Sequence, residues 1–195
     1  MYNKSQPLNL GHAFSSAPWV IPALIVTLVV SLLLHRWLAR RFRTAPWFVL
    51  ALMLCIGAIL SITITPGIWN PSHSCSLKVA FPHPSDLFSF SERSLNIWLF
   101  VPLGLTIAAT PRRRVGVFFF ACAMAMPFMI EGFQHFVPDI GRTCQLTDVI
   151  NNLTGLFLGG FVGLCVRLFW GMMNGGRETL RVGQPSGYLH EQRKI

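Results

Sequence analysis

The stretch EGFQHFVPDIGRTCQLTDVINNLTGLFLGG, Glu131 to Gly160, governs how this chain is organised. It begins where one apolar run is ending and finishes inside another. Between those runs it gathers polar residues that are unusual in so hydrophobic a chain: Glu131, Gln134, His135, Asp139, Arg142, Asp148, Asn151 and Asn152. The stretch therefore predicts two helices joined by a short polar connection.

The composition of the whole chain indicates a membrane protein. Of its 195 residues, 52% are hydrophobic and only 12% are charged, which is about half the charge of an average soluble domain. The formal net charge of +9 raises nucleic-acid binding as an alternative. The basic residues lie in clusters between apolar runs, however, so we interpret them as topology signals and expect no nucleic-acid partner.

Five apolar runs can be compared with the roughly 17 to 25 residues that a helix needs to cross a bilayer. They occupy residues 17–34, 46–65, 95–110, 115–130 (or as far as 135) and 149–170. The third run is short and contains Pro102 and Gly104, so we expect it to be kinked or partly buried against its neighbours. Whether it crosses fully is left open. The sequence predicts an all-α transmembrane bundle of about five helices.

The chain is expected to form one transmembrane domain at residues 17–172, between polar tails at 1–16 and 173–195. We expect residues 1–16 and 174–195 to be loosely ordered. The first run lacks both a basic segment before it and an early small-residue cleavage site, so it does not resemble a cleavable signal peptide. We therefore expect this run to be retained.

Basic residues alternate from one side of the predicted bundle to the other. Loops at residues 35–45 and 111–114, Arg167 and the C-terminal tail place twelve basic and two acidic residues on one side. The other side holds four basic and five acidic residues. Because short cytoplasmic loops carry the excess of positive charge, we predict an outside N-terminus and an inside C-terminus. The basic loops would then also contact anionic lipid.

In this orientation the polar stretch lies at the outer membrane surface. Glu131, Gln134 and His135 share one face of the fourth predicted helix, since they are three and four residues apart. Asp148 and Asn152 share a face of the fifth predicted helix. The same face continues as a small-xxx-small ladder, which allows close helix packing in lipid, at Gly155, Gly159 and Gly163.

A tight antiparallel hairpin would bring Asp148 and Asn152 opposite Glu131 and Gln134, with Arg142 in the loop above them. Each residue also has a purely structural interpretation, because Asp148 can cap a helix and Arg142 can simply neutralise the carboxylates. Taken together they favour a functional site, since ionisable groups at membrane depth are costly and usually have a partner or a task.

The chain resembles the VanZ-like family of small bacterial membrane proteins in an ordered set of residues: Asn96-x-x-x-Phe100-x-Pro102-x-Gly104, Glu131, Gln134, Gly141-Arg142, Asp148 and Asn152-x-x-Gly155-x-x-x-Gly159. The resemblance covers about residues 95–163 and adds Asn96 to the cluster. It implies a polytopic protein of the bacterial cytoplasmic (inner) membrane with a cell-envelope role. The family is named after an accessory protein linked to teicoplanin resistance. Gln145 and Thr147 stand where the family often has acidic residues, which argues against cation binding.

Three functional interpretations fit this site. In a membrane enzyme, Glu131 or Asp148 would be the general acid or base, and an anionic head group would be held by Asn96, Gln134, Arg142 and Asn152. In a binding protein the same residues would recognise a lipid or lipid-linked envelope precursor without chemistry. In an architectural protein they would only tie helices together. No nucleophile stands firmly beside a base, so enzymatic activity is left open.

The cysteines divide into two groups. Cys75 and Cys144 lie in predicted outer segments, where an oxidising compartment permits a disulfide that would pin one loop over the other; the pairing is left open. Cys55, Cys122 and Cys165 lie in apolar runs and are interpreted as packing residues. His73, Cys75 and His83 match no familiar metal spacing, so we expect neither a metal nor a cofactor.

Overall fold

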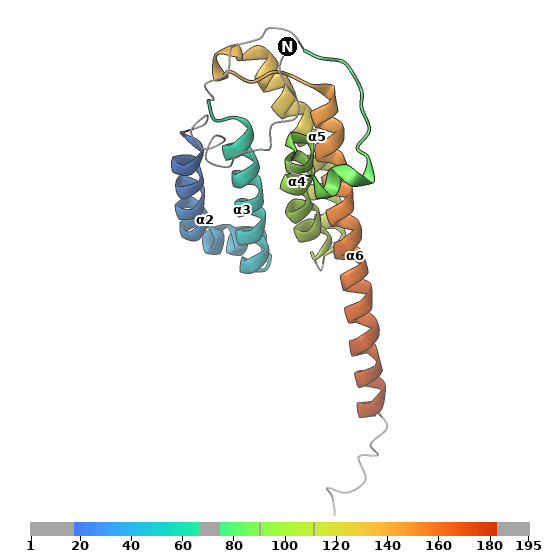
Figure 1. Cartoon of the computed structure of the whole chain (residues 1–195). Helices are drawn as coiled ribbons and strands as arrows, with labels where there is room; N and C mark the ends of the chain where they lie inside the picture. The colour runs from blue at the N-terminus through green and yellow to red at the C-terminus, as the bar shows by residue number, and fades with distance from the viewer. Residues whose placement is uncertain (1–17, 67–74, 90, 111, 183–195) are drawn as a thin grey trace, which may run out of the picture.

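The computed structural model of the protein describes residues 18–66, 75–89, 91–110 and 112–182 (Figure 1). Within these ranges there are five α-helices, two short 3₁₀ helices and one isolated β-bridge, with no strand. The helices are α2 (Val20–Phe42), α3 (Pro46–Thr63), η1 (Pro84–Phe88), α4 (Glu92–Ala108), α5 (Arg113–Phe136), η2 (Pro138–Ile140) and α6 (Leu146–Val182). The all-α class predicted from the sequence is confirmed.

Four helices of the described part are long and apolar enough to cross a membrane: α2, α3, α5 and the Leu146–Met173 part of α6. The remaining helix, α4, has 17 residues, which is about 25 Å of helix. It lies inside the bundle, where it contacts α3, α5 and α6 and buries Ile97, Phe100 and Leu103. This agrees with the expectation that its neighbours partly bury the third apolar run.

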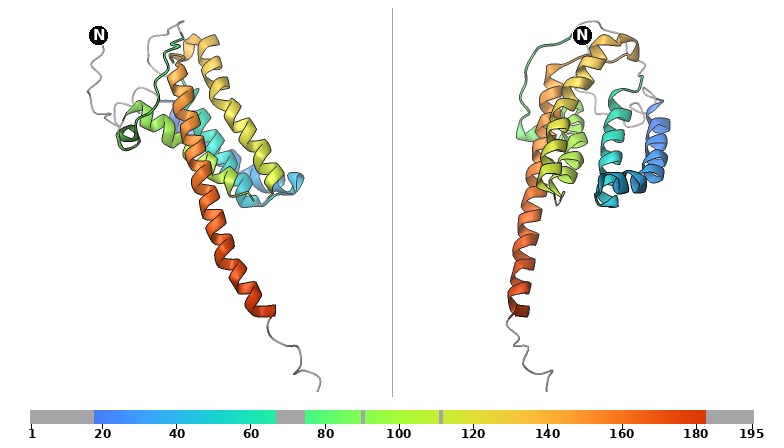
Figure 2. Two further views of the ribbon diagram at one scale, coloured as in Figure 1. Left: turned by 90° about the vertical axis from the view of Figure 1, so that its right-hand side faces the viewer. Right: turned by 180° about the vertical axis from the view of Figure 1, so that it is seen from behind.

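The helix connections gather at two opposite ends of the bundle (Figures 1 and 2). The α5–α6 connection, residues 137–145, lies at the end where α3 finishes, and we call this the polar end. The α2–α3 turn at residues 43–45 lies at the opposite end, beside Thr110 and Arg112 between α4 and α5. We call this the basic end. The two basic connections therefore lie together, as the alternation of charge predicts.

The glycine face of α6 packs directly on the backbone of α4. A Cβ atom added at Gly155 would collide with the carbonyl oxygen of Ile97, and one added at Gly159 would collide with that of Val101. Gly104 of α4 makes the equivalent close contact with α6, because a Cβ atom at Gly104 would collide with the Leu156 carbonyl oxygen. Close approach in lipid depends on small residues of this kind. The sequence did not identify α4 as the partner of this face.

The hydrophobic core lies among α3, α4, α5 and α6 and includes Leu52, Phe100, Leu103, Ile130 and Leu156. Helix α2 lies at the edge and packs mainly on α3. Most of the large apolar side chains of α2 are exposed, as expected for a helix that faces lipid.

Helix α6 is longer than its apolar run. It continues to Val182, about 55 Å in all, and extends past the other helices beyond the basic end (Figure 2). Residues 174–182, at the start of the expected C-terminal tail, belong to this helix, and the loose order of the tail stays a prediction. Residues 1–17 and 183–195 lie outside the described ranges.

Candidate functional site

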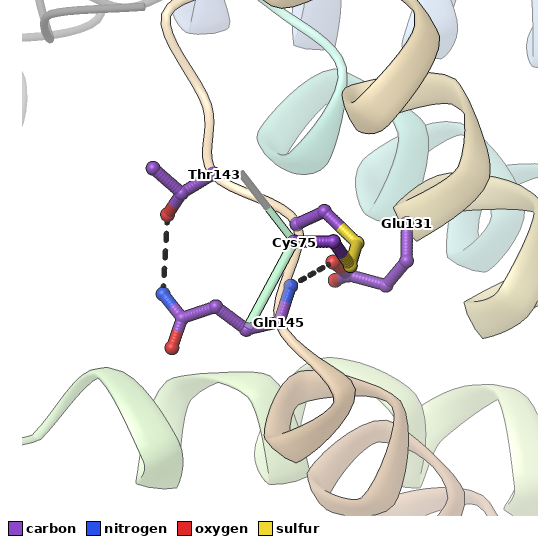
Figure 3. The surroundings of a disulfide bond; sticks show 5 residues. Cys75, Glu131, Thr143 and Gln145 are labelled. Atoms are coloured by element: carbon purple, nitrogen blue, oxygen red, sulfur yellow. Dashed lines mark hydrogen bonds between the residues drawn. A yellow bond between two sulfur atoms is a disulfide. The ribbon is translucent and has the colours of Figure 1, made fainter. Parts of the chain in front are cut away.

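Glu131 forms a hydrogen bond with the backbone at the N-terminus of α6. Its side chain is only 6% exposed, and its Oε2 accepts a hydrogen bond of 2.7 Å from the backbone N–H of Gln145, immediately before α6 (Figure 3). The first N–H groups of a helix lack partners within the helix, and a carboxylate is favoured at this positive end. Glu131 thus caps α6 from α5, which fixes the geometry of the α5–α6 hairpin.

A disulfide joins Cys75 and Cys144 beside this cap (Figure 3). The two chain segments also pair through their backbones, because Ser76 N–H donates to Cys144 O at 2.9 Å and Leu146 N–H donates to Ser76 O at 3.0 Å. Thr147 Oγ1 adds a hydrogen bond of 2.8 Å to Lys78 O. The segment from Cys75 to Lys78 is therefore fastened along the beginning of α6.

Gln134 and Arg142 satisfy backbone carbonyls at the end of α3. Gln134 Nε2 donates to Thr63 O at 3.0 Å in a buried setting, and an Nη2–H of Arg142 donates to Ile62 O at 2.8 Å. The last carbonyls of a helix have no partners within it, so these two side chains complete α3. The sequence predicted both as ligand-binding residues, and their contacts in the structure are structural ones.

Asp148 lies against the start of α4. The Asn96 side chain hydrogen-bonds to it, and Glu92, Arg93 and Arg142 are close enough to interact with it electrostatically. Glu131 also interacts electrostatically with Asp148. All six residues predicted to bind or react with a ligand therefore lie at the polar end, on α4, α5, α6 and the α5–α6 connection.

Three polar residues of this cluster carry buried hydrogen-bonding atoms without a partner among the described residues. Asn151 is fully buried, and neither atom of its amide has a hydrogen-bond partner among the described residues. The side-chain oxygen of Asn152 and the Nε of Arg142 are likewise buried without a partner in that part of the chain. Burial lowers the pKa of Arg142, an effect that Glu92 and Asp148 oppose. Arginine nevertheless stays charged in proteins.

Glu92, Arg93 and Asn151 also lie in this cluster, although the sequence did not indicate them as site residues. Glu92 lies one helical turn before Asn96 on α4, so its spacing was a usable signal. Asn151 had been noted as polar but not assigned to the site. His135 is exposed and contacts the ring of Phe136, so it does not join the cluster despite its helical spacing.

No group of three or more His, Cys, Asp or Glu side chains suited to a metal occurs in the described ranges; His73 lies outside them. A groove of about 590 Å³ is formed by Phe81 and apolar residues of α6 such as Ile150, Leu153 and Phe157. These positions lie on the side of α6 opposite Asp148 and Gly155. The groove is therefore separate from the polar cluster.

These features define a small multi-pass membrane protein whose helices are tied together at one end by polar side chains and a disulfide. A family model described as VanZ/LLP1 matches residues 48–169, more than half of the chain, and the protein belongs to this family. The match begins in α3 and is longer than the resemblance seen in the sequence. Comparisons with curated proteins and with solved structures found no match.

Proposed function

We propose that the polar end recognises the head group of an anionic lipid or a lipid-linked cell-envelope molecule. The observation that carries this proposal is the set of buried polar atoms on Arg142, Asn151 and Asn152 without partners among the described residues. Buried polar atoms in folded proteins nearly always have hydrogen-bond partners. A ligand with several polar groups would supply them.

The residue types narrow the chemistry of that ligand. The guanidinium of Arg142 uses one Nη on Ile62 O, and its remaining donors suit a phosphate or carboxylate. Glu92 and Asp148 lie nearby and repel a ligand that is anionic throughout. The head group we propose therefore also carries hydroxyl or amino groups, which donate to Asp148 and to the amides of Asn151 and Asn152.

The contacts of Glu131 favour binding over catalysis. Its carboxylate holds a backbone N–H, and Gln134 is similarly occupied on α3, so we propose both as positioning residues. The same contacts favour the alternative that the whole cluster only ties helices together. The two functions predict different results for substitution of Asn151, because its side chain makes no hydrogen bond within the described residues and so connects no helices there.

An isosteric substitution separates the two functions. Asn151→Leu removes unpaired polar atoms from a buried position, which is neutral or stabilising when no partner is lost. If the polar end binds a head group, this variant should keep or raise its Tm but lose bound lipid. The measurement is mass spectrometry of lipids that copurify with the full chain, set against the lipids of the same membranes.

Thr154→Val is the matched control. Thr154 lies on the groove side of α6, and among the described residues its hydroxyl donates a hydrogen bond to Ile150 O of the same helix. Wild type and Thr154→Val should both enrich one lipid class several-fold, and Asn151→Leu should not. Equal lipid profiles in all three proteins would contradict head-group recognition and leave the architectural function.

We further propose that the polar end faces outward from the bacterial cytoplasmic membrane and the basic end faces the cytoplasm. The excess of basic residues supports this orientation, and a disulfide at the polar end supports it independently, because disulfides persist in oxidising compartments. A cysteine introduced at Arg112 should resist a membrane-impermeant thiol reagent in intact cells, in a background without free cysteines. Labelling of that cysteine would reverse the orientation.

The sequence resemblance connects the family with glycopeptide-antibiotic resistance, and we propose such a link here as a consequence of head-group recognition. Expression of the wild type should raise the minimal inhibitory concentration of teicoplanin, whereas Asn151→Leu at equal membrane abundance should not. An increase that survives this substitution would separate resistance from the polar end.

A further inference from the structure

A second polar feature lies at the basic end, far from the cluster described above. A cavity of about 180 Å³ opens between the α2–α3 turn and the α4–α5 connection, and its lining comprises Arg43, Thr44, Ala45, Phe48, Thr110, Arg112 and Val115. A single water needs only about 10–15 Å³, so a larger polar group can enter. None of the lining residues is acidic.

Two of the lining residues, Thr44 and Thr110, carry buried hydroxyl groups without a hydrogen-bond partner among the described residues. Thr110 is 3% exposed, and its Oγ1 has no hydrogen-bond partner among the described residues. The Oγ1 of Thr44, on the α2–α3 turn, is also buried without a partner among these residues. A hydroxyl both donates and accepts, so two such groups suit a ligand with several oxygen atoms.

The charge of the cavity is positive. Arg43 and Arg112 line it from opposite segments, and Arg167 of α6 fixes the α4–α5 connection through a hydrogen bond of 2.8 Å from Nη1 to Thr110 O. Two helices also begin here, α3 after Ala45 and α5 after Arg112. Neither has a side-chain cap at its N-terminus or an acidic residue in its first turn. Uncapped helix N-termini favour anions.

The left-handed backbone conformation of Arg43 also indicates that its side chain has a function at this position. Arg43 has φ of 52°, in the left-handed region, and it ends α2 by donating its N–H to Ala39 O and Arg40 O. Glycine fits this position without strain and is the usual residue there. An arginine at a strained position beside a cavity is consistent with a functional use of its guanidinium.

We propose that this cavity binds a phosphate group, and that the phosphate belongs to the head group of an anionic phospholipid. Arg43 and Arg112 neutralise its charge, and the hydroxyls of Thr44 and Thr110 donate hydrogen bonds to its oxygens. The site lies at the end of the bundle opposite the cluster around Asp148. It therefore stands or falls independently of the function proposed for that cluster.

Two variants test the site without depending on one side chain. Arg43→Gly removes a cationic side chain while relieving the backbone, and Thr110→Val removes an unpaired hydroxyl at constant shape, so both should fold. Arg41→Gln is the control, because Arg41 is an exposed residue at the end of α2 that does not line the cavity. The full chain would be reconstituted in nanodiscs of phosphatidylcholine, with or without phosphatidylglycerol.

Native mass spectrometry then counts the phosphatidylglycerol molecules that remain bound after release from the discs. Wild type and Arg41→Gln should retain phosphatidylglycerol over phosphatidylcholine, and Arg43→Gly and Thr110→Val should each retain it at least several-fold less. Equal retention by all four proteins would overturn the site. A thermal shift with millimolar inorganic phosphate matching that with phosphatidylglycerol, lost in Arg43→Gly, would overturn the lipid assignment in favour of a free anion.

Discussion

The two ends of the bundle satisfy their helix termini in different ways. At the polar end, Glu131 accepts from Gln145 N–H, Gln134 and Arg142 bond to carbonyls of α3, and Ser91 caps α4. At the basic end, α3 and α5 begin without a side-chain cap. The chain therefore closes one end with its own side chains and a disulfide. At the other end, the uncapped N-termini of α3 and α5 and the arginines that line the cavity can bind the phosphate group proposed above.

Removal of the disulfide should weaken the closed end most. Cys75→Ala with Cys144→Ala frees a loop that spans a sequence separation of 69, and a disulfide typically contributes about 2–4 kcal/mol. We expect a lower Tm for the purified protein, and the same decrease when wild type is treated with reductant. Cys122→Ala, at an exposed free cysteine, should change neither value. A double variant as stable as wild type would show that the backbone pairing alone closes this end.

Loss of the Glu131 cap should have the next largest effect. Glu131→Leu leaves the Gln145 N–H without its acceptor, and a buried donor left unsatisfied costs about 1–3 kcal/mol. Glu131→Gln keeps an oxygen acceptor and should lose about half of that or less. Thermal unfolding of both variants measures the difference. Similar losses for the two would mean that the charge of Glu131, not its acceptor oxygen, stabilises the hairpin.

Gln134→Leu should cost somewhat less, about 1–2 kcal/mol, because it leaves the buried Thr63 carbonyl unpaired. The effect should appear as faster hydrogen exchange in the last turn of α3. Exchange in α2, which packs mainly on α3, should stay unchanged. Uniform exchange across both helices would contradict a local role for this side chain.

The smallest change in stability is expected at the basic end. Thr110→Val in lipid-free detergent should alter the free energy of unfolding by less than about 0.5 kcal/mol, or stabilise the protein, because its hydroxyl has no partner to lose among the described residues. Equilibrium unfolding in detergent measures this. If Thr110→Val lowered the free energy of unfolding as much as Gln134→Leu, the proposed difference between the two ends would be contradicted.

Much of this organisation could be predicted from the sequence. Apolar runs located the helices, and alternating charge placed the two basic connections at one end. Helix α3 shows where such reasoning stops, because its role at the polar end depends on the backbone carbonyls of Ile62 and Thr63, which any residue provides. The family match includes α3, yet α3 carries no polar motif that marks its membership.

The partner of the glycine face was hidden for the same reason. Gly155 and Gly159 approach the backbone of Ile97 and Val101, and a contact with backbone does not constrain which side chain stands opposite. The unpaired hydroxyl of Thr110 was also unpredictable, since burial of a side chain depends on the tertiary packing around it. The sequence thus shows which residues are polar, but it does not show which of their side chains lack a hydrogen-bond partner in the folded protein.

The disulfide between Cys75 and Cys144 also makes the chain a covalent ring from one cysteine to the other. All of α4 and α5 lie within that ring, together with the connection at the basic end. A protease that cuts this connection opens the ring without dividing the molecule. The nicked protein would migrate as one species on a gel without reductant and as two fragments with it.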